Sequence, residues 1–129
     1  MIAHIILNVR DFKESELFYD MILGKLGFTE DFKEVDSKGA VKSYRRDTHN
    51  IWIKYNNETV HNDFVRDIGL DHIAFLAESK SEIDKLFELV RTFDVKITRE
   101  PRKYPEYTEN YYAFYFRDPN GIPLEICMM

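Results

Sequence analysis

The sequence contains a single cysteine, Cys127, among its 129 residues. One thiol cannot form a disulfide within the chain, so a reducing cytoplasm is the expected compartment. Long apolar runs are also missing, and none approaches the roughly 20 residues that a membrane-spanning helix needs. No basic segment followed by an apolar core stands at the N-terminus, so we expect no signal peptide and no membrane partner.

Positive charge is scarce as well. Lys and Arg number 18 against 23 Asp and Glu, which gives a formal net charge of −5. Proteins that recognise phosphate backbones usually carry an excess of Lys and Arg, so nucleic acid is not an expected partner. Hydrophobic residues make up 44% and aromatic residues 15% of the chain, enough for a packed core in one domain of this length. We expect a globular protein with a small-molecule site.

The first half of the chain predicts one strand, one helix and three further strands. Residues 2–9 alternate as a strand, with His4 on the face that mixes polar and apolar groups. Asp11 and Glu14 fit a capping box. The helix that follows has apolar residues at helical spacing until Gly24 and Gly27 end it: Leu17, Phe18, Met21 and Ile22. Strands are predicted at 28–35, 41–46 and 51–55.

After a polar linker the same order starts again. Residues 70–76 predict a strand, Ser79 with Glu82 caps a helix, and strands follow at 95–99, 111–116 and 122–127. Only the loop at 100–109 has no clear counterpart in the first half. The sequence therefore predicts an α+β fold of two βαβββ modules with pseudo-twofold symmetry that form a cupped mixed sheet. Module 1 spans about 1–56, the linker about 57–69 and module 2 about 70–129, within a single domain, 1–129.

The repeat also holds residue by residue. The segment 46–55 aligns with 117–126, so that the Arg-Asp pair, the turn and the strand fall in register. This alignment puts Lys54 at the position of Glu125, and it puts His4 over His72. If the modules pack as pseudo-twofold mates, the two histidines become related by symmetry on one concave surface.

Glu125 is the carboxylate for which the sequence predicts a cationic partner. It follows the turn sequence Asp-Pro-Asn-Gly at 118–121, on a strand where Pro123, Glu125 and Cys127 share one face. A carboxylate placed among apolar residues is almost never buried without a compensating charge, proton or metal. Something cationic should therefore face Glu125.

That cation could be a metal ion bound by two imidazoles and one carboxylate. His4, His72 and Glu125 make the ligand set of a facial triad, which leaves coordination positions open and suits Fe(II), with Mn(II), Ni(II), Co(II) or Zn(II) as alternatives. Taken singly, a strand histidine is more often a hydrogen-bonded core residue and a strand glutamate usually faces solvent. The combination at repeat-related positions carries the metal hypothesis.

Lys54 allows three interpretations. A protonated lysine cannot ligate a metal. A four-ligand site with a second carboxylate at the position of Lys54 is therefore excluded. In the first interpretation, Lys54 binds an anionic substrate beside the metal. In the second, it replaces the metal by pairing with Glu125, and in the third it points away from the pocket. Of the remaining candidates, His49 and His61 are expected to be solvated and Cys127 to be inert packing. Four strand aromatics are expected mainly in the core, with one or two lining the cavity: Tyr44, Trp52, Tyr112 and Tyr115.

These segments together resemble the glyoxalase/bleomycin-resistance/extradiol-dioxygenase superfamily, also called vicinal oxygen chelate (VOC) proteins. The resemblance rests on residues 4–11, 18–19, 26–28, 71–75, 116–121 and 124–125, and it covers essentially the whole chain. In that family, metal ligands come from the opening and last strands of each module. The resemblance thus implies His4, His72 and Glu125 as ligands, with Lys54 where glyoxalase I enzymes have a carboxylate or similar ligand. That departure argues against strict lactoylglutathione-lyase activity.

The leading hypothesis is a divalent-metal-dependent enzyme that acts on a small oxygen-rich substrate by bidentate chelation. The reaction would be of the lyase or isomerase, dioxygenase or antibiotic-modifying type, the last including fosfomycin-modifying transferases and hydrolases. Glu125 and Lys54 are the candidate catalytic residues. The alternative is a metal-free protein that sequesters a bleomycin-type antibiotic, which the acidic balance would suit. Members of the family commonly dimerise, and exposed strand edges favour a homodimer.

Overall fold

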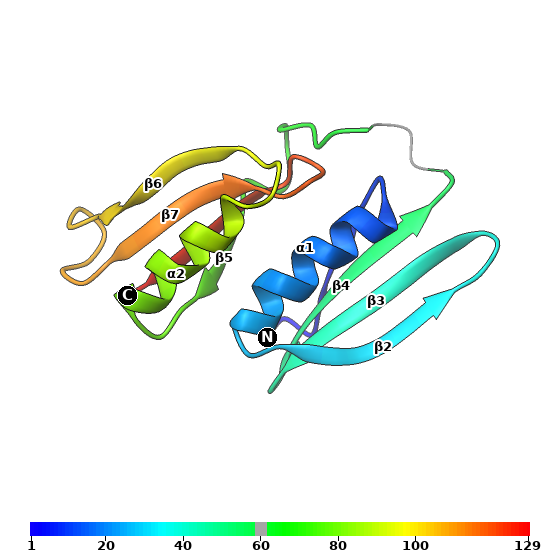
Figure 1. The fold of residues 1–129 in the computed structure, drawn as a ribbon, viewed down its shortest axis with the longest axis horizontal. Helices are drawn as coiled ribbons and strands as arrows, with labels where there is room; N and C mark the ends of the chain where they lie inside the picture. Colours follow the sequence, from blue (N-terminus) through cyan, green and yellow to red (C-terminus); the bar gives the residue numbers. More distant parts are fainter. Residues whose placement is uncertain (59–61) are drawn as a thin grey trace. The chain divides into compact units, whose positions relative to one another are not determined.

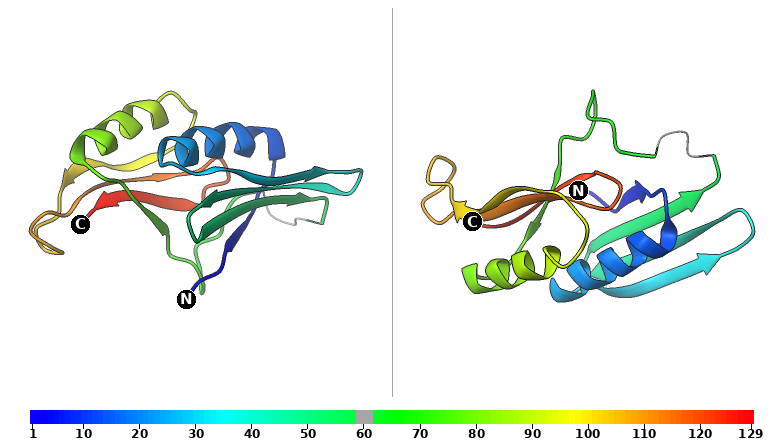
Figure 2. Two further views of the ribbon diagram at one scale, coloured as in Figure 1. Left: turned by 90° about the horizontal axis from the view of Figure 1, so that it is seen from below. Right: turned by 45° about the horizontal axis from the view of Figure 1, so that its top comes forward.

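The computed structural model describes residues 1–58 and 62–129 (Figure 1). The chain forms two compact units, Met1–Asp63 (unit 1) and Phe64–Met129 (unit 2). Each unit has one four-stranded mixed sheet with a helix against one face, which confirms the two predicted βαβββ modules (Figure 2). His61, for which a solvated position was expected, lies outside the described residues. No helix in the described ranges is both long and apolar enough to cross a membrane.

Unit 1 has the strand order β1-β4-β3-β2. β1 pairs in parallel with β4, and the other two pairings are antiparallel. The elements are β1 (Ile5–Asn8), α1 (Phe12–Lys25), β2 (Thr29–Val35), β3 (Gly39–Arg46) and β4 (His49–Asn56). The predicted strands are thus all present, with ends that shift by up to three residues. One difference concerns His4, which stands just before β1 rather than within it.

α1 begins where the capping box predicts. The Asp11 carboxylate accepts a hydrogen bond of 3.0 Å from the backbone N–H of Glu14. Gly24 lies inside the helix, and the chain turns at Gly27, whose φ of 86° favours glycine. The face of α1 that packs on the sheet is fully buried and consists of Phe18, Tyr19, Ile22 and Leu23. Leu17, assigned to this face from sequence, is instead 67% exposed.

A buried lysine joins α1 to the sheet of unit 1. Lys42 on β3 is 5% exposed, and its Nζ lies 2.8 Å from Asp20, 3.0 Å from Glu30 and 3.2 Å from Glu16. The Asp20 carboxylate also accepts a hydrogen bond of 2.8 Å from the Tyr44 hydroxyl. Burial opposes the charge of Lys42, but the three carboxylates outweigh it and raise the pKa of the lysine. This ion cluster is a structural feature that the sequence analysis did not identify.

Unit 2 repeats the arrangement with the strand order β5-β8-β7-β6. Its elements are β5 (Ile73–Leu76), α2 (Lys80–Val90), β6 (Ile97–Lys103), β7 (Tyr112–Arg117) and β8 (Pro123–Met128). The Ser79 hydroxyl caps α2 by accepting from the backbone N–H of Glu82 at 3.1 Å. Ile83, Leu86 and Val90 are buried, and the Phe87 ring packs edge-on against Phe114 with centroids 5.5 Å apart. β6 includes the first residues of the segment 100–109 that was expected to be loop.

The turn before β8 fixes the position of Glu125. The carboxylate of Asp118 accepts hydrogen bonds of 2.8 Å from the backbone N–H groups of Asn120 and Ile122. Gly121 takes a φ of 83°, the region that favours glycine. Asp118 and Asn120 are buried, so the turn chemistry predicted from sequence is confirmed as a rigid support for the strand.

The strand registers correct the position assigned to Lys54. In unit 1, Ile6 on β1 stands opposite Trp52, whereas in unit 2 the equivalent Ala74 on β5 stands opposite Glu125. The counterpart of Glu125 is therefore Trp52, and Lys54 corresponds to Cys127. With His4 over His72, the pairing of β1 with β4 and of β5 with β8 thus shows that the assignment of Lys54 to the Glu125 position was wrong by two residues. An alignment carried through the turns does not keep the strands in register, because the turns differ in length. Two residues separate the last pair of β3 and β4, and five residues separate the last pair of β7 and β8.

Candidate functional site

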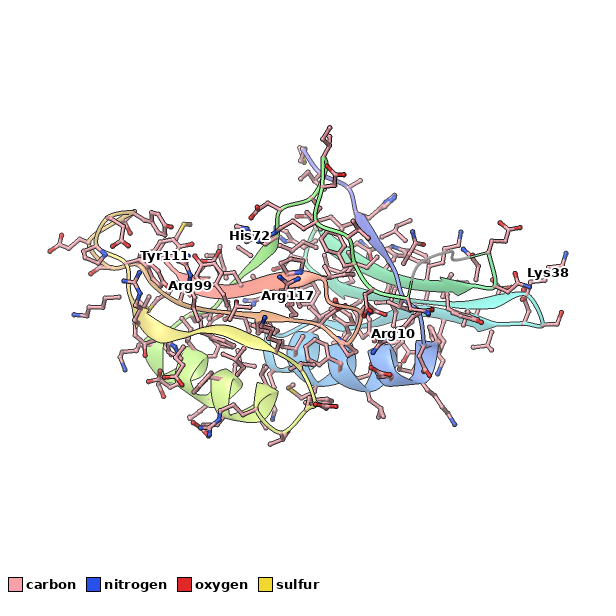
Figure 3. The ribbon with its side chains drawn as sticks, turned by 90° about the horizontal axis from the view of Figure 1, so that it is seen from above. Arg10, Lys38, His72, Arg99, Tyr111 and Arg117 are labelled. Carbon is pink, nitrogen blue, oxygen red and sulfur yellow. The ribbon has the colours of Figure 1, made fainter. Side chains whose placement is uncertain are left out.

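Two of the three predicted ligands lie side by side in unit 2. His72 stands just before β5 and Glu125 lies on β8, and the parallel pairing of these strands brings the residues together. His72 Nε2 is 3.0 Å from Glu125 Oε2, although the residues are 53 positions apart in sequence. Glu125 is 2% exposed, so the predicted buried carboxylate is confirmed. Its neighbours Leu124 and Ile126 are buried as well, and Figure 3 shows His72 on the side of the sheet turned away from α2.

The other oxygen of Glu125 is held by a tyrosine that the sequence analysis did not single out. The Tyr111 hydroxyl donates a hydrogen bond of 2.6 Å to Glu125 Oε1. Burial, together with this bond, raises the pKa of Tyr111, so the hydroxyl keeps its proton at neutral pH. Tyr111 directly precedes β7, two residues after the segment 100–109 that has no counterpart in the first half. The absence of a counterpart to the segment 100–109 in the first half was the sequence feature that could have pointed to this part of the site.

His72 is placed between two carboxylates. Its Nδ1 is 2.6 Å from Asp71 Oδ1, while its Nε2 faces Glu125. The hydrogen bond to His72, followed by the charge of Arg66, lowers the pKa of Asp71. A neutral imidazole carries only one N–H, so it can satisfy only one of two ionised carboxylates. A cation between Nε2 and Glu125 would satisfy the carboxylate that a single N–H does not reach.

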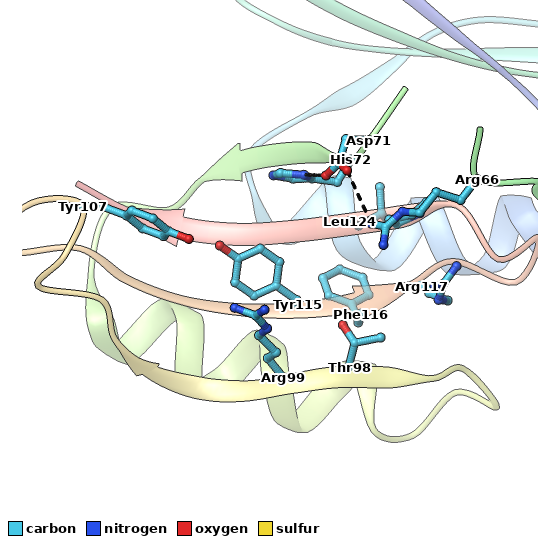
Figure 4. A pocket seen from close by; sticks show the side chains of 11 residues that line it. Arg66, Asp71, His72, Thr98, Arg99, Tyr107, Tyr115, Phe116, Arg117 and Leu124 are labelled. Atoms are coloured by element: carbon cyan, nitrogen blue, oxygen red, sulfur yellow. Dashed lines mark hydrogen bonds and ion pairs between the residues drawn. The ribbon is translucent and has the colours of Figure 1, made fainter. Parts of the chain in front are cut away.

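A cavity of about 440 Å³ opens beside this group, within unit 2. Figure 4 shows the side chains that line it, which come from β6, β7, β8, the loop between β6 and β7, and the segment before β5. The lining residues are Arg66, Asp71, His72, Thr98, Arg99, Tyr107, Tyr115, Phe116, Arg117, Pro123 and Leu124. Tyr115 thus lines the cavity, as expected for one or two of the strand aromatics. Its pKa is raised by burial and by the negative charge of Glu125.

The three arginines of the cavity could not be singled out from sequence, because charged residues in predicted strands and linkers are usually solvated. Arg66, Arg99 and Arg117 all line this cavity, and they come from three separate segments (Figure 4). This convergence depends on the pairing of β6 with β7 and on the path of the chain before β5, neither of which has a local sequence signal.

An aromatic cluster supports the loop that carries Tyr111. Tyr104 is fully buried, its ring stacks on Tyr107 at 5.6 Å, and the Arg102 guanidinium lies 3.7 Å from its centroid. Ala113 and Cys127 pack beneath Tyr104 in one hydrophobic cluster. Burial raises the pKa of the Cys127 thiol, so this cysteine is packed and protonated, in line with the expectation of inert packing.

The other predicted site residues lie in unit 1. His4 is exposed before β1, and Lys54 is exposed on β4 with no ion pair to any described residue. Within the described part of either unit taken alone, no three His, Cys, Asp or Glu side chains are grouped to hold a metal. The ligand role of His4 and the catalytic role of Lys54 therefore stay predictions. His49 is exposed as expected, Tyr44 and Tyr112 are buried, and Trp52 is half-buried with its ring 5.8 Å from Phe32.

The chain thus has two βαβββ modules, and in the second a part-buried contact joins His72, before the first strand, to Glu125 on the last strand. The sequence model of the Glyoxalase/Bleomycin resistance protein/Dioxygenase superfamily matches residues 1–126, and the chain belongs to this family. The resemblance noted from sequence is therefore confirmed.

Solved structures of the same kind cover nearly the whole chain. A putative glyoxalase from Bacillus halodurans is 28% identical, with a TM-score of 0.75 and coverage of 100% of this chain and 96% of that one. A glyoxylase/bleomycin resistance protein/dioxygenase domain from Frankia sp. EAN1pec has a TM-score of 0.80 at 23% identity, covering 99% and 96%. The fosfomycin resistance protein FosX from Listeria monocytogenes, solved with Mn(II) and sulfate, has a TM-score of 0.71 at 22% identity, covering 100% and 92%. The last two similarities concern the fold.

Proposed function

We propose that this protein is a divalent-metal-dependent enzyme of the VOC type, which acts on a small substrate presenting two adjacent oxygens. His4, His72 and Glu125 would hold the ion, with Fe, Mn, Ni, Co or Zn as candidates. Bound there, the ion would serve as a Lewis acid toward the substrate oxygens. The observation that carries the proposal is the 3.0 Å contact between His72 Nε2 and the buried Glu125 carboxylate.

The chemistry of these residues fits a metal ion. In metal centres the ligating histidine usually donates its other ring N–H to a carboxylate, which fixes the ring and leaves the ligating nitrogen unprotonated. Asp71 accepts such a bond at Nδ1, so the Nε2 lone pair would point toward Glu125. Two facing acceptors, a lone pair and a carboxylate, attract a cation between them. Manganese in the FosX structure supports the choice of a divalent ion, since that protein has the same fold.

The rest of the ligand set is argued from the repeat. His4 stands before β1 as His72 stands before β5, so the family pattern assigns it as the second imidazole. Trp52, at the position that corresponds to Glu125, has no group that can ligate a metal. The set would therefore comprise three protein ligands and leave positions open for substrate. Lys54, exposed on β4, would offset negative charge on the substrate.

Two tyrosines of the site would donate hydrogen bonds, one to Glu125 and one into the cavity. Tyr111 holds one oxygen of Glu125 and leaves the other toward His72. Tyr115, protonated because its pKa is raised, can donate a hydrogen bond into the cavity. The protein would act in the cytoplasm as a homodimer, in keeping with its single buried cysteine and with β2, an edge strand whose residues are all exposed.

The alternative, a metal-free protein that sequesters a bleomycin-type antibiotic, is motivated by Lys54 together with the acidic net charge, which would suit a cationic ligand. The cavity itself is lined by three arginines and one aspartate, which disfavours a cationic ligand at that place. Metal binding separates the two functions.

The test is a titration of EDTA-treated protein with Mn(II), followed by electron paramagnetic resonance. We expect one bound ion per chain in the wild type and none at the same concentration after His72→Ala or Glu125→Gln. His49→Ala is the matched control, because His49 is an exposed histidine outside the proposed set. Undiminished stoichiometric binding by folded His72→Ala would reject the assignment, and absence of binding for all candidate metals would favour the sequestering protein.

A further inference from the structure

The cavity of unit 2 differs in charge from the protein as a whole. Three guanidinium groups, those of Arg66, Arg99 and Arg117, and one carboxylate, that of Asp71, line it. Three positive charges and one negative charge leave two net positive charges, in a chain whose formal net charge is −5. A local excess of cations in a concave site attracts anions, since low-dielectric walls concentrate the field there.

The three arginines are not equivalent. Arg66 is 3.8 Å from the Asp71 carboxylate, and Arg117 donates a hydrogen bond of 3.0 Å to the Gly121 carbonyl. Arg99 has no ion pair with any described residue, and its guanidinium lies 5.5 Å from the centroid of the Tyr115 ring. Neither Arg99 nor Arg117 pairs with a carboxylate of a described residue, and Arg99 is the one of the three that also makes no hydrogen bond to the described part of the chain.

The strand that carries Arg99 is irregular at this residue. The pairing of β6 with β7 shifts register between Ile97 and Arg99, and again between Arg99 and Arg102. Such bulges redirect a side chain and are frequent next to binding sites. Figure 4 shows the Arg99 side chain extending from β6 toward Tyr115.

Two tyrosine hydroxyls complete the surroundings of Arg99. Figure 4 shows the hydroxyl groups of Tyr107 and Tyr115 turned toward each other beside the cavity. Both can donate hydrogen bonds to an oxyanion, and their rings give a flat surface for an apolar or unsaturated group. A volume of about 440 Å³ is within the range of small-molecule sites.

We propose that Arg99, with the hydroxyls of Tyr107 and Tyr115, binds an oxyanion group on a small substrate, a carboxylate or a phosphonate or phosphate monoester. Planar guanidinium donors suit both anions because they can form two parallel hydrogen bonds to either. This inference rests on the proposed function only in naming the anion as part of a substrate. Anion binding itself requires no metal.

The test is isothermal titration calorimetry on the full chain in EDTA at low salt, with phenylphosphonate, benzoate and the neutral benzyl alcohol as probes. We expect saturable one-to-one binding of at least one anion and no detectable binding of benzyl alcohol. Arg99→Gln should weaken that binding at least tenfold. Arg91→Gln is the matched control, because Arg91 is an exposed arginine at the end of α2 that pairs with Glu88, and it should bind as the wild type does.

Comparison of the two anions identifies the kind of oxyanion that the site prefers. Tighter binding of phenylphosphonate assigns a tetrahedral anion, and tighter binding of benzoate assigns a carboxylate. Equal binding by Arg99→Gln and the wild type, or binding of benzyl alcohol as tight as that of the anions, would overturn the proposal. A Mn(II) titration of the wild-type protein beside its anion titration separates the two claims: a failed metal titration with intact anion binding rejects the metal proposal alone, and the reverse rejects the anion site alone.

Discussion

The hydrogen bond from Tyr111 to Glu125 gives the most direct test of how the buried carboxylate is stabilised. It measures 2.6 Å, and its acceptor is a carboxylate that is 2% exposed. Hydrogen bonds to charged groups contribute about 1.5–3 kcal/mol, and the cost is greatest when a buried charge loses its donor. We therefore expect Tyr111→Phe to lower the free energy of unfolding of the metal-free protein by about 1.5–3 kcal/mol at pH 7, measured by urea denaturation.

The pH dependence of this effect has a definite sign. Because the pKa of Tyr111 is raised by burial and by Glu125, its contribution is fully present below the unfolded value of about 10. It is lost only as pH rises through the higher folded value. The difference between the wild type and Tyr111→Phe should thus stay constant from pH 7 to pH 9.

Tyr107→Phe is the matched control for this prediction. Tyr107 stacks on the ring of Tyr104, which Tyr111 meets edge-on with centroids 6.2 Å apart, but the Tyr107 hydroxyl makes no hydrogen bond to a described residue. Its loss should change the free energy of unfolding by less than about 0.5 kcal/mol. If Tyr111→Phe were no more destabilising than Tyr107→Phe, the account of Glu125 as a carboxylate held by Tyr111 would be refuted.

Three further predictions concern other parts of the structure. Lys42→Met should lower the free energy of unfolding by about 2–4 kcal/mol in urea denaturation at pH 7, because it leaves three carboxylates without their shared cation; a change below about 0.5 kcal/mol would contradict it. Trp52→Glu should change the Mn(II) affinity and Lys54→Glu should not, since only Trp52 matches Glu125 in strand register. Calorimetry in which Lys54→Glu changes the affinity and Trp52→Glu does not would reject the register argument. In absorbance titration at 295 nm, at most four of the eight tyrosines should ionise near pH 10 before unfolding, because raised pKa values protect Tyr44, Tyr111, Tyr112 and Tyr115.

The sequence was sufficient for the fold because its signals are local. Capping residues at Asp11 and Ser79 marked both helix starts, and the Asp-Pro-Asn-Gly turn marked the start of β8. Strict alternation around Glu125 predicted a buried carboxylate. Each of these depends on residues a few positions apart, so each can be recognised without knowing the tertiary structure.

The candidate site could be predicted only in part, because its remaining members depend on long-range geometry. The adjacency of His72 and Glu125 follows from parallel pairing of β5 with β8, which the repeat implied. The role of Tyr111 and the convergence of the arginines depend on how an irregular segment returns over the sheet, and no local pattern encodes that. Lys54 was misplaced by two residues because the alignment was carried through turns of unequal length, whereas the counterpart of Glu125 follows from the long-range pairing of β1 with β4 and of β5 with β8.

The central claim is that His72 and Glu125 bind one metal ion, and crystallographic location of that ion tests it most directly. Crystals grown with Mn(II) should give an anomalous difference peak about 2.0–2.3 Å from both His72 Nε2 and a Glu125 oxygen. Asp71 should remain hydrogen-bonded to His72 Nδ1. A peak at any other residue, or Mn(II)-soaked crystals in which the 3.0 Å contact between His72 and Glu125 persists with no peak beside it, would contradict the account.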